Sequence, residues 1–250
     1  MESETKNHRM LEKALHILEY VASCPDGASL TDVCATLDIA KSSAYSLLMT
    51  FLHFGYIAKN PHNRFVIGLR AFEIGSRFVE NNDFYLYSRD VLEELVRVTN
   101  ETAHLAVLEG TDVVYLSKFD CSHVVRMVSS VGKRVPAHVT ALGKALLSGK
   151  SDEEIQTLYH NRELERMTDN SISTVEELLR QLTQIRTSGF AYESEESTLG
   201  IRCIAVPVRN STGEVCLGIS ISVPTLRVDF GLEQVKQPLL EARRRLERVL

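Results

Sequence analysis

The chain has 250 residues, of which 44% are hydrophobic and 24% are charged, and its net charge is −5. This is enough for two globular domains with a sizeable core. No apolar run approaches the roughly 18 residues of a membrane helix, and the polar N-terminus is unlike a secretory signal. The five cysteines are odd in number and lack metal-ligand spacing, which argues against a disulfide framework and favours a protein of the reducing cytoplasm.

The negative charge is unevenly distributed. Residues 1–70 hold seven basic and seven acidic residues, whereas the remainder holds 21 basic and 26 acidic ones. Between Ile39 and Arg70 there are four basic residues and no acidic residue. A DNA-binding surface is therefore possible in this stretch, with few phosphate contacts and a shallow dependence on salt.

The first predicted element is an amphipathic helix over residues 8–22, with Leu11, Leu15, Leu18, Val21 and Ala22 on one apolar face. The stretch from Thr31 to Gly68 then predicts a short helix, a tight turn and a second helix. Serine after the turn suits the N-cap of the second helix, which is expected to end near Gly55.

Two strand signals, at residues 56–58 and 65–67, flank a turn at residues 60–63. A helix-turn-helix followed by a hairpin is the winged form of the motif, whose second helix can lie in the major groove of DNA. The alternative is a structural element that binds no nucleic acid. The small polar face of the second helix favours DNA binding; it consists of Lys41, Ser42, Ser43, Tyr45 and Ser46.

A linker helix follows, with Leu69, Phe72 and Val79 in a stripe that suits core packing or a dimer contact equally well. The second domain is predicted to be α/β with a largely antiparallel sheet, so the whole chain is of the α+β class with two domains. Its expected elements are a helix over 84–99, strands over 102–109, 113–119 and 124–129, a helix opening at Thr140, helices capped at Ser151 and Ser173, strands over 203–208 and 215–223, and a helix over 231–250.

A collinear set of segments from residue 9 to residue 250 resembles the IclR family of bacterial transcriptional regulators. They include KSSAYSLL from Lys41, VPAHVTALGKALL from Val135, GIRCIAVPV from Gly200 and ISIS from Ile219. The resemblance implies a winged helix-turn-helix over 1–68, a linker helix over 69–82 and a GAF-like effector domain over 83–250. It also implies a cytoplasmic homodimer or homotetramer that binds operator DNA and a small anionic metabolite, with no cofactor, metal or membrane.

Family members usually carry a basic residue where this chain has Ser46. Arginine can grip a phosphate or a guanine edge with two hydrogen bonds, whereas serine cannot. We therefore expect base readout to depend on Lys41, Ser42, Ser43 and Tyr45. Lys59 and Arg64 of the wing are expected to reach phosphates.

The helix that opens at Thr140 offers free backbone N–H groups, those of Ala141 and Leu142, to a carboxylate. Strand alternation puts Ser220 and Ser222 on one face of the sheet, about 7 Å apart. By resemblance, Cys203, Ser220 and Ser222 match family ligand contacts, and Glu193 stands where the family commonly has Asp. Arg126 and Met127 are expected to add a charged contact and an apolar wall.

The expected function is therefore DNA-binding transcriptional regulation of a catabolic operon, with repression favoured over activation, under control of a sugar acid or a keto or hydroxy acid. The alternative is a hydrolase with Cys203 as nucleophile and His138 or His104 as base. No local pattern supports that alternative, because Cys203 lies mid-strand between apolar residues. A DNA-free interaction protein is a third possibility.

Overall fold

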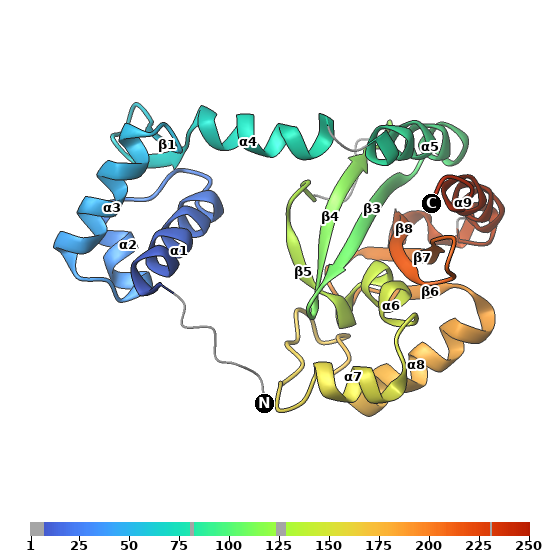
Figure 1. The fold of residues 1–250 in the computed structure, drawn as a ribbon. Coiled ribbons are helices and arrows are strands. Elements are labelled where there is room, and N and C mark those ends of the chain that lie inside the picture. The colour runs from blue at the N-terminus through green and yellow to red at the C-terminus, as the bar shows by residue number, and fades with distance from the viewer. Residues whose placement is uncertain (1–7, 81–82, 124–128, 231) are drawn as a thin grey trace. The chain divides into compact units, whose positions relative to one another are not determined.

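The computed structural model describes residues 8–80, 83–123, 129–230 and 232–250. The chain divides into two compact units, Met1–Asp83 and Phe84–Leu250, which are treated separately below (Figure 1). Among the described residues, no helix is long and apolar enough to cross a membrane.

The first unit is a winged helix-turn-helix followed by a helix. Its core is a small apolar cluster that includes Ile17, Val33, Leu48, Ile57 and Phe65. The elements are α1 (Arg9–Ser23), α2 (Leu30–Leu37), α3 (Lys41–His53), the antiparallel pair β1 (Ile57–Lys59) and β2 (Phe65–Ile67), and α4 (Leu69–Glu80).

Local chemistry explains the turns of this unit. Ser29 accepts a hydrogen bond from the Asp32 backbone N–H, and the Asp32 carboxylate accepts one from the Ser29 N–H, so a capping box starts α2. The helix ends at Asp38 in the left-handed region, with φ 49°. A Cβ on Gly68 would lie 2.3 Å from the Gly55 carbonyl oxygen, so only glycine lets the end of the wing approach the end of α3.

The buried face of α1 agrees only in part with the predicted one, since Val21 is buried and Leu18 packs against the core cluster as expected. Ala14, Ile17 and Val21 face the core, whereas Leu11 and Leu15 are 59% and 50% exposed. The apolar residues of α1 form two strips on the surface of the helix. Leu11 and Leu15 belong to the strip that the unit leaves exposed.

The second unit is built on one six-stranded, entirely antiparallel sheet with strand order β5-β4-β3-β8-β7-β6. The predicted class, an α+β protein with an antiparallel sheet in its second domain, is confirmed. The strands are β3 (Thr102–Glu109), β4 (Asp112–Phe119), β5 (Arg134–Pro136), β6 (Ala191–Ser194), β7 (Ile201–Arg209) and β8 (Val215–Pro224).

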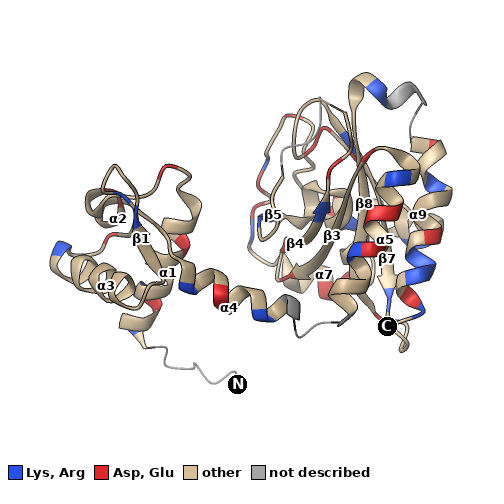
Figure 2. Ribbon diagram, turned by 90° about the horizontal axis from the view of Figure 1, so that it is seen from above, with Lys and Arg blue, Asp and Glu red and all other residues tan. Residues whose placement is uncertain are grey.

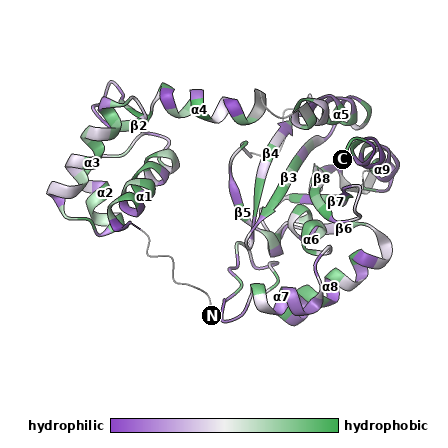
Figure 3. Ribbon diagram, viewed as in Figure 1, coloured by the Kyte–Doolittle hydropathy of each residue, from purple (hydrophilic) through white to green (hydrophobic). Residues whose placement is uncertain are grey.

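Helices cover both faces of this sheet (Figures 1 and 3). On one face, α5 (Asp83–Thr99) and α9 (Leu232–Glu247) pack on Leu105, Ile204 and Ile219. The short α6 (Ala141–Leu147) packs on the other face, and α7 (Asp152–Leu158) and α8 (Val175–Ser188) extend the same apolar cluster. Because side chains alternate along each strand, every second residue of β3, β7 and β8 points toward α6.

Several details of this unit were predicted wrongly. The edge strands β5 and β6 were missed, because each has only three or four residues. The N-cap of α8 is Thr174, whose side chain accepts from the Glu177 N–H, and not Ser173. The helical spacing of Leu92, Leu95 and Val98 predicts that all three face inward, but Val98 of α5 is 56% exposed. Five of the six positions of the strand expected over 124–129, namely 124–128, lie outside the described residues.

Candidate DNA interface and effector site

The outward face of α3 carries the polar residues that the sequence singled out. Lys41, Ser42, Tyr45 and Ser46 are exposed, and Ser43 is half-buried. This arrangement follows from the helix period, because Ala44 and Leu48 fill the core on the opposite side. Thr50, four residues beyond Ser46, continues the same exposed face. Thr50 was not among the predicted residues, although its i, i+4 spacing from Ser46 would have placed it on the same face of the helix.

The N-terminus of α3 has no side-chain cap. Its N-cap residue is Ala40, and not a serine as predicted, and it makes no capping hydrogen bond. The first turn contains no acidic residue, and α3 shows none along its length (Figure 2). The first backbone N–H groups of α3 therefore point outward from a helix end of positive potential, which suits an anionic partner.

The two wing cations differ in their surroundings. Lys59 is exposed, donates a 2.7 Å hydrogen bond to the Asn63 side chain and lies 5.4 Å from the Phe65 ring centre. Arg64 donates through Nε to the Gly27 carbonyl at 2.7 Å and forms a 2.6 Å ion pair with Asp32. The Arg64 guanidinium thus ties the wing to the first turn of α2, and its side chain remains 40% exposed, so the phosphate contact expected of Arg64 stays a prediction.

In the second unit, strand register brings the predicted effector residues into one row. Glu193 of β6 stands opposite Cys203 of β7, and Cys203 stands opposite Ser222 of β8. Ser222 in turn faces Thr102 of β3. A second row, one pleat away on the same face, runs from Ala205 through Ser220 and His104 to Lys118. We call these two rows the polar floor.

The polar floor is buried and only partly hydrogen-bonded. Cys203, Ser220 and Ser222 are 8%, 2% and 3% exposed. The Cys203 thiol lies 3.2 Å from the Ser222 hydroxyl. Among the described residues, the Ser220 hydroxyl has no hydrogen-bond partner. The Ser220 hydroxyl is not among the atoms wholly cut off from solvent, so it is available to a ligand or to ordered water.

The start of α6 lies over this face, as predicted. Thr140 is its N-cap, and the Thr140 hydroxyl accepts a 2.9 Å hydrogen bond from the Gly143 N–H. The amides of Ala141 and Leu142 precede the first helical hydrogen bond, which runs from Lys144 N–H to the Thr140 carbonyl. Both residues are buried, and a Cβ on Gly218 of β8 would lie 3.0 Å from the Leu142 side chain, so α6 sits tightly on the sheet.

Glu193 is engaged mainly with its own loop. Its Oε1 accepts hydrogen bonds from the backbone N–H groups of Glu196 at 2.6 Å and Ser197 at 3.0 Å. Its other oxygen, Oε2, is buried without a partner. Burial raises the pKa of this carboxyl despite those hydrogen bonds. The longer side chain therefore folds back to hold the loop with one oxygen and leaves the second free.

The sequence did not draw attention to Lys144, although it lies in one of the resembling segments. Its side chain is fully buried and pairs with Glu196 at 2.7 Å and with the Gln181 side-chain oxygen at 2.9 Å. This pair anchors the loop after β6 to α6. Arg126 and Met127, which the sequence also placed at the site, lie outside the described residues.

The arrangement does not suit nucleophilic catalysis. Burial raises the pKa of the Cys203 thiol well above its ordinary value, so the reactive thiolate is disfavoured. His138 donates through Nε2–H to the Glu165 carbonyl, 2.9 Å away, and makes no hydrogen bond to Cys203. His104 bonds Ser129 instead, at 2.7 Å. Among the described residues, no group of three side chains could hold a metal ion.

Comparison with known proteins agrees with this geometry. The sequence profile of the IclR helix-turn-helix domain matches residues 10–61, and that of the bacterial transcriptional regulator IclR C-terminal domain matches residues 77–248. The chain is 37% identical over 209 residues to the HTH-type transcriptional regulator KdgR of Escherichia coli, covering 83% of this chain and 79% of KdgR. It is 30% identical to the HTH-type transcriptional repressor AllR of Salmonella typhimurium, covering 89% of this chain and 82% of AllR.

Its fold is similar to the crystal structure of Thermotoga maritima IclR, with a TM-score of 0.75, 28% identity and coverage of 97% and 98% of the two chains. Family, fold and site geometry agree, and the hydrolase alternative finds no support. The chain belongs to the IclR family of bacterial transcriptional regulators and is not an enzyme.

Proposed function

We propose that this regulator is a cytoplasmic repressor of a catabolic operon, and that a small carboxylate metabolite bound on the polar floor controls its affinity for operator DNA. One observation carries the effector half of this proposal: the buried, unpartnered Oε2 of Glu193 and the unpartnered hydroxyl of Ser220 lie on the face of the sheet that α6 covers. A carboxylate at the amides of Ala141 and Leu142 would reach both serine hydroxyls. Repression is favoured by analogy with AllR, a repressor by name.

The DNA half rests on α3. Its uncapped N-terminus and the exposed Lys41, Ser42, Tyr45 and Ser46 form a face without acidic residues. We assign phosphate contacts to the α3 amides, Lys41 and Lys59, and base contacts to Ser42, Ser43 and Tyr45. Ser46 weakens this grip relative to arginine, so paired half-sites on a dimer are expected to supply much of the affinity.

We further propose that exposed apolar side chains on α1 and α4 form the dimer surface. Leu69 and Phe72 of α4 are 71% and 70% exposed, and Leu11 and Leu15 of α1 are half exposed or more. Large exposed apolar side chains of this kind are candidates for an interaction surface.

A two-stage experiment tests the proposal. First, small carboxylates are screened by thermal shift on the full chain, because a ligand that binds only the native state raises the melting temperature. Second, the best ligand is added to a gel shift with the DNA upstream of the gene. A hit that releases the chain from DNA supports repression, and a hit that strengthens binding contradicts it.

The matched control is the double variant Ser220→Ala with Ser222→Ala. It should fold and bind DNA like the parent but lose the thermal shift. An undiminished thermal shift in this variant would overturn the assignment of the effector to the polar floor.

A further inference from the structure

The polar floor continues beyond the serines, toward β4. On β3, His104 stands directly between Ser220 of β8 and Lys118 of β4 in the strand register. Its ring lies 5.1 Å from the ring of Tyr115. His104 and Tyr115 are 1% and 4% exposed. The proposed carboxylate contacts do not involve His104 or Tyr115 at this β4 end of the polar floor.

Polar atoms at this end are also unpartnered. Nε2 of His104 bonds the Ser129 hydroxyl at 2.7 Å. In the part of the chain that the structure describes, neither Nδ1 of His104 nor the Tyr115 hydroxyl has a hydrogen bond. The Ser220 hydroxyl, directly across from His104, has none either. The three residues are buried, but these polar atoms are not among those wholly cut off from solvent, so a ligand or ordered water can reach and satisfy them.

The length of the row indicates the size of that ligand. Neighbouring strands lie about 4.8 Å apart, so the row from Ala205 on β7 through Ser220 on β8 to His104 on β3 spans roughly 10 Å. An acid of two or three carbons held at α6 and the serines would leave His104 and Tyr115 unsatisfied. An open chain of five or six carbons, with a hydrogen bond at each end, matches the row.

The charges at this end favour hydroxyl groups over a second carboxylate. Burial and the nearby Lys118 charge lower the pKa of His104 to about 4, so the imidazole is neutral at physiological pH. Tyr115 is also neutral, because burial raises its pKa. Lys118 is already paired with Asp120 at 2.9 Å and donates to the Ser129 carbonyl. Neutral donors and acceptors pair well with hydroxyls, whereas a desolvated carboxylate needs a cation or the free amides of a helix start, such as those of α6.

We propose that His104 and Tyr115 form a second polar subsite of the effector site, which receives hydroxyl groups of an open-chain, polyhydroxylated monocarboxylic acid of five or six carbons. The carboxylate end of the acid occupies the start of α6 and the serines. This inference rests on the proposed function and deepens it, because it specifies the length and the chemistry of the end remote from the carboxylate.

Isothermal calorimetry on the full chain tests the subsite with four kinds of probe: glycolate, a set of five- and six-carbon aldonates that differ in hydroxyl stereochemistry, the unhydroxylated hexanoate, and the dicarboxylate glucarate. The tightest aldonate should bind at least about tenfold more tightly than glycolate, hexanoate and glucarate, as expected for one or two well-made hydrogen bonds. Equal affinity for glycolate and every aldonate, or tighter binding of glucarate, would overturn the subsite.

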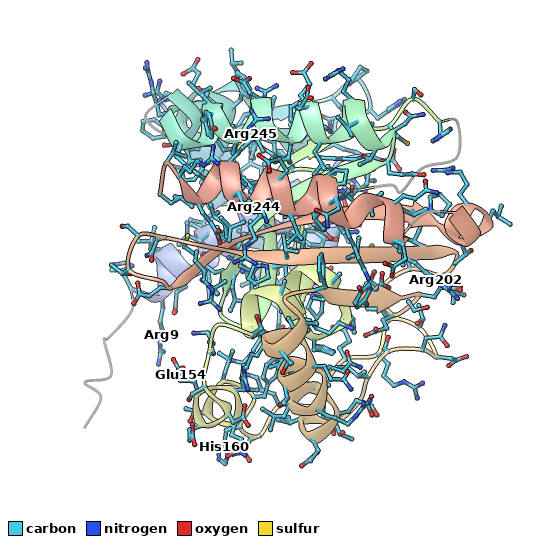
Figure 4. All side chains as sticks on the ribbon, turned by 90° about the vertical axis from the view of Figure 1, so that its right-hand side faces the viewer. Arg9, Glu154, His160, Arg202, Arg244 and Arg245 are labelled. Carbon is cyan, nitrogen blue, oxygen red and sulfur yellow. The ribbon has the colours of Figure 1, made fainter. Side chains whose placement is uncertain are left out.

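Single substitutions test whether the higher affinity for aldonates depends on His104 and Tyr115. His104→Phe keeps the ring against Tyr115 but removes both ring nitrogens, and it should lower aldonate affinity about tenfold while leaving glycolate affinity unchanged. Tyr115→Phe should act in the same direction. His160→Ala is the control, because His160 is exposed at the end of α7, away from the sheet (Figure 4). Circular dichroism melts verify that each variant is folded.

The outcomes separate the two proposals. If glycolate binds, and Ser220→Ala with Ser222→Ala abolishes its binding, but aldonates bind no more tightly, only the subsite is refuted. If His104→Phe weakens glycolate and aldonates equally, the histidine supports the fold rather than the ligand, which also refutes it. If no carboxylate binds at all, both the subsite and the proposed function are wrong.

Discussion

Lys144 shows how one buried charge organises the effector domain. Its ammonium group is out of contact with water and is balanced by Glu196 on the loop that follows β6. That loop is also held by Glu193, whose Oε1 accepts its backbone N–H groups. Lys144 of α6 and the Glu193 carboxylate of β6 thus both hold the loop after β6 in place beside the polar floor.

Breaking this ion pair should be costly. Lys144→Met leaves the Glu196 carboxylate buried without its cation, and we expect the free energy of unfolding to fall by about 3–5 kcal/mol. Lys144→Met combined with Glu196→Leu should recover most of that loss, because no charge then remains unpaired. Urea denaturation of the three proteins measures both effects. A double variant as unstable as Lys144→Met would show that packing, and not the unpaired charge, is responsible.

His104 predicts a specific pH dependence of stability. Its pKa is about 4 in the folded protein and near the ordinary 6.5 in the unfolded chain. Between these values the unfolded chain binds the proton and the native protein does not, so stability decreases as pH falls from 6.5 to 4. The contribution is roughly 3 kcal/mol across that window.

The non-titrating variant His104→Asn should therefore show a flatter curve of unfolding free energy against pH between 4 and 6.5. Chemical denaturation at closely spaced pH values makes the comparison. Parallel curves for the parent and the variant would mean that His104 titrates alike in both states, contrary to its burial.

At the residue scale, the sequence predicts which site residues share a face of the sheet, because this depends only on strand alternation and register. Cys203, Ser220 and Ser222 share a face because each strand alternates and the register aligns them. The partners of Glu193 and Arg64 could not be predicted. Both side chains fold back onto segments whose positions depend on tertiary packing, namely the loop after β6 and the first turn of α2.

At the scale of single elements, α2 and α3 have contrasting N-termini. The start of α2 is closed by the Ser29 and Asp32 capping box, whereas α3 starts at Ala40 without any side-chain acceptor. A DNA phosphate can supply the missing acceptor. A residue at position 40 that caps α3 should therefore stabilise the helix but weaken its binding to DNA.

Ala40→Ser tests this competition. A serine N-cap should raise the free energy of unfolding by about 1 kcal/mol, and it should weaken operator binding because its hydroxyl occupies an amide that would otherwise meet a phosphate. Fluorescence anisotropy with labelled DNA gives the affinity, and Ala40→Gly serves as the control without a hydroxyl. Stronger DNA binding by Ala40→Ser would contradict the phosphate role of this helix end.

Element by element, the long periodic segments were the most predictable. The helices α5 and α9 and the strands β3, β4, β7 and β8 follow their apolar patterns within a few residues. The edge strands β5 and β6 were not predictable, because three or four residues carry too little alternation to separate strand from loop. The buried face of α1 was also predicted only in part, since both of its strips are apolar and only tertiary packing selects one.

At the scale of the whole molecule, the exposed apolar strips on α1 and α4 require an explanation. A dimer that buries them would present two recognition helices to two half-sites. The charged residues of α5 and α9 do not suggest another interaction surface, since acidic and basic residues are interspersed on these helices and form no patch of a single sign (Figure 2).

Phe72→Glu should therefore shift the full chain toward monomer at micromolar concentration, because a charge replaces an apolar contact. Phe72 is 70% exposed, so the fold should tolerate the change. Phe72→Leu, which stays apolar, is the matched control. Sedimentation velocity distinguishes the species, and an unchanged oligomer in Phe72→Glu would remove this surface from the proposed interface.

The central claim is that a hydroxylated acid on the polar floor of the second unit controls DNA binding by the first. The most direct test is an anisotropy titration of the full chain on its own upstream DNA, with and without the tightest aldonate, for the parent and for Ser220→Ala with Ser222→Ala. The account predicts that the aldonate lowers the DNA affinity of the parent at least about tenfold, as for a typical allosteric coupling, and leaves the variant unchanged. A parent whose DNA affinity is the same with saturating aldonate, or a variant that responds like the parent, would contradict it.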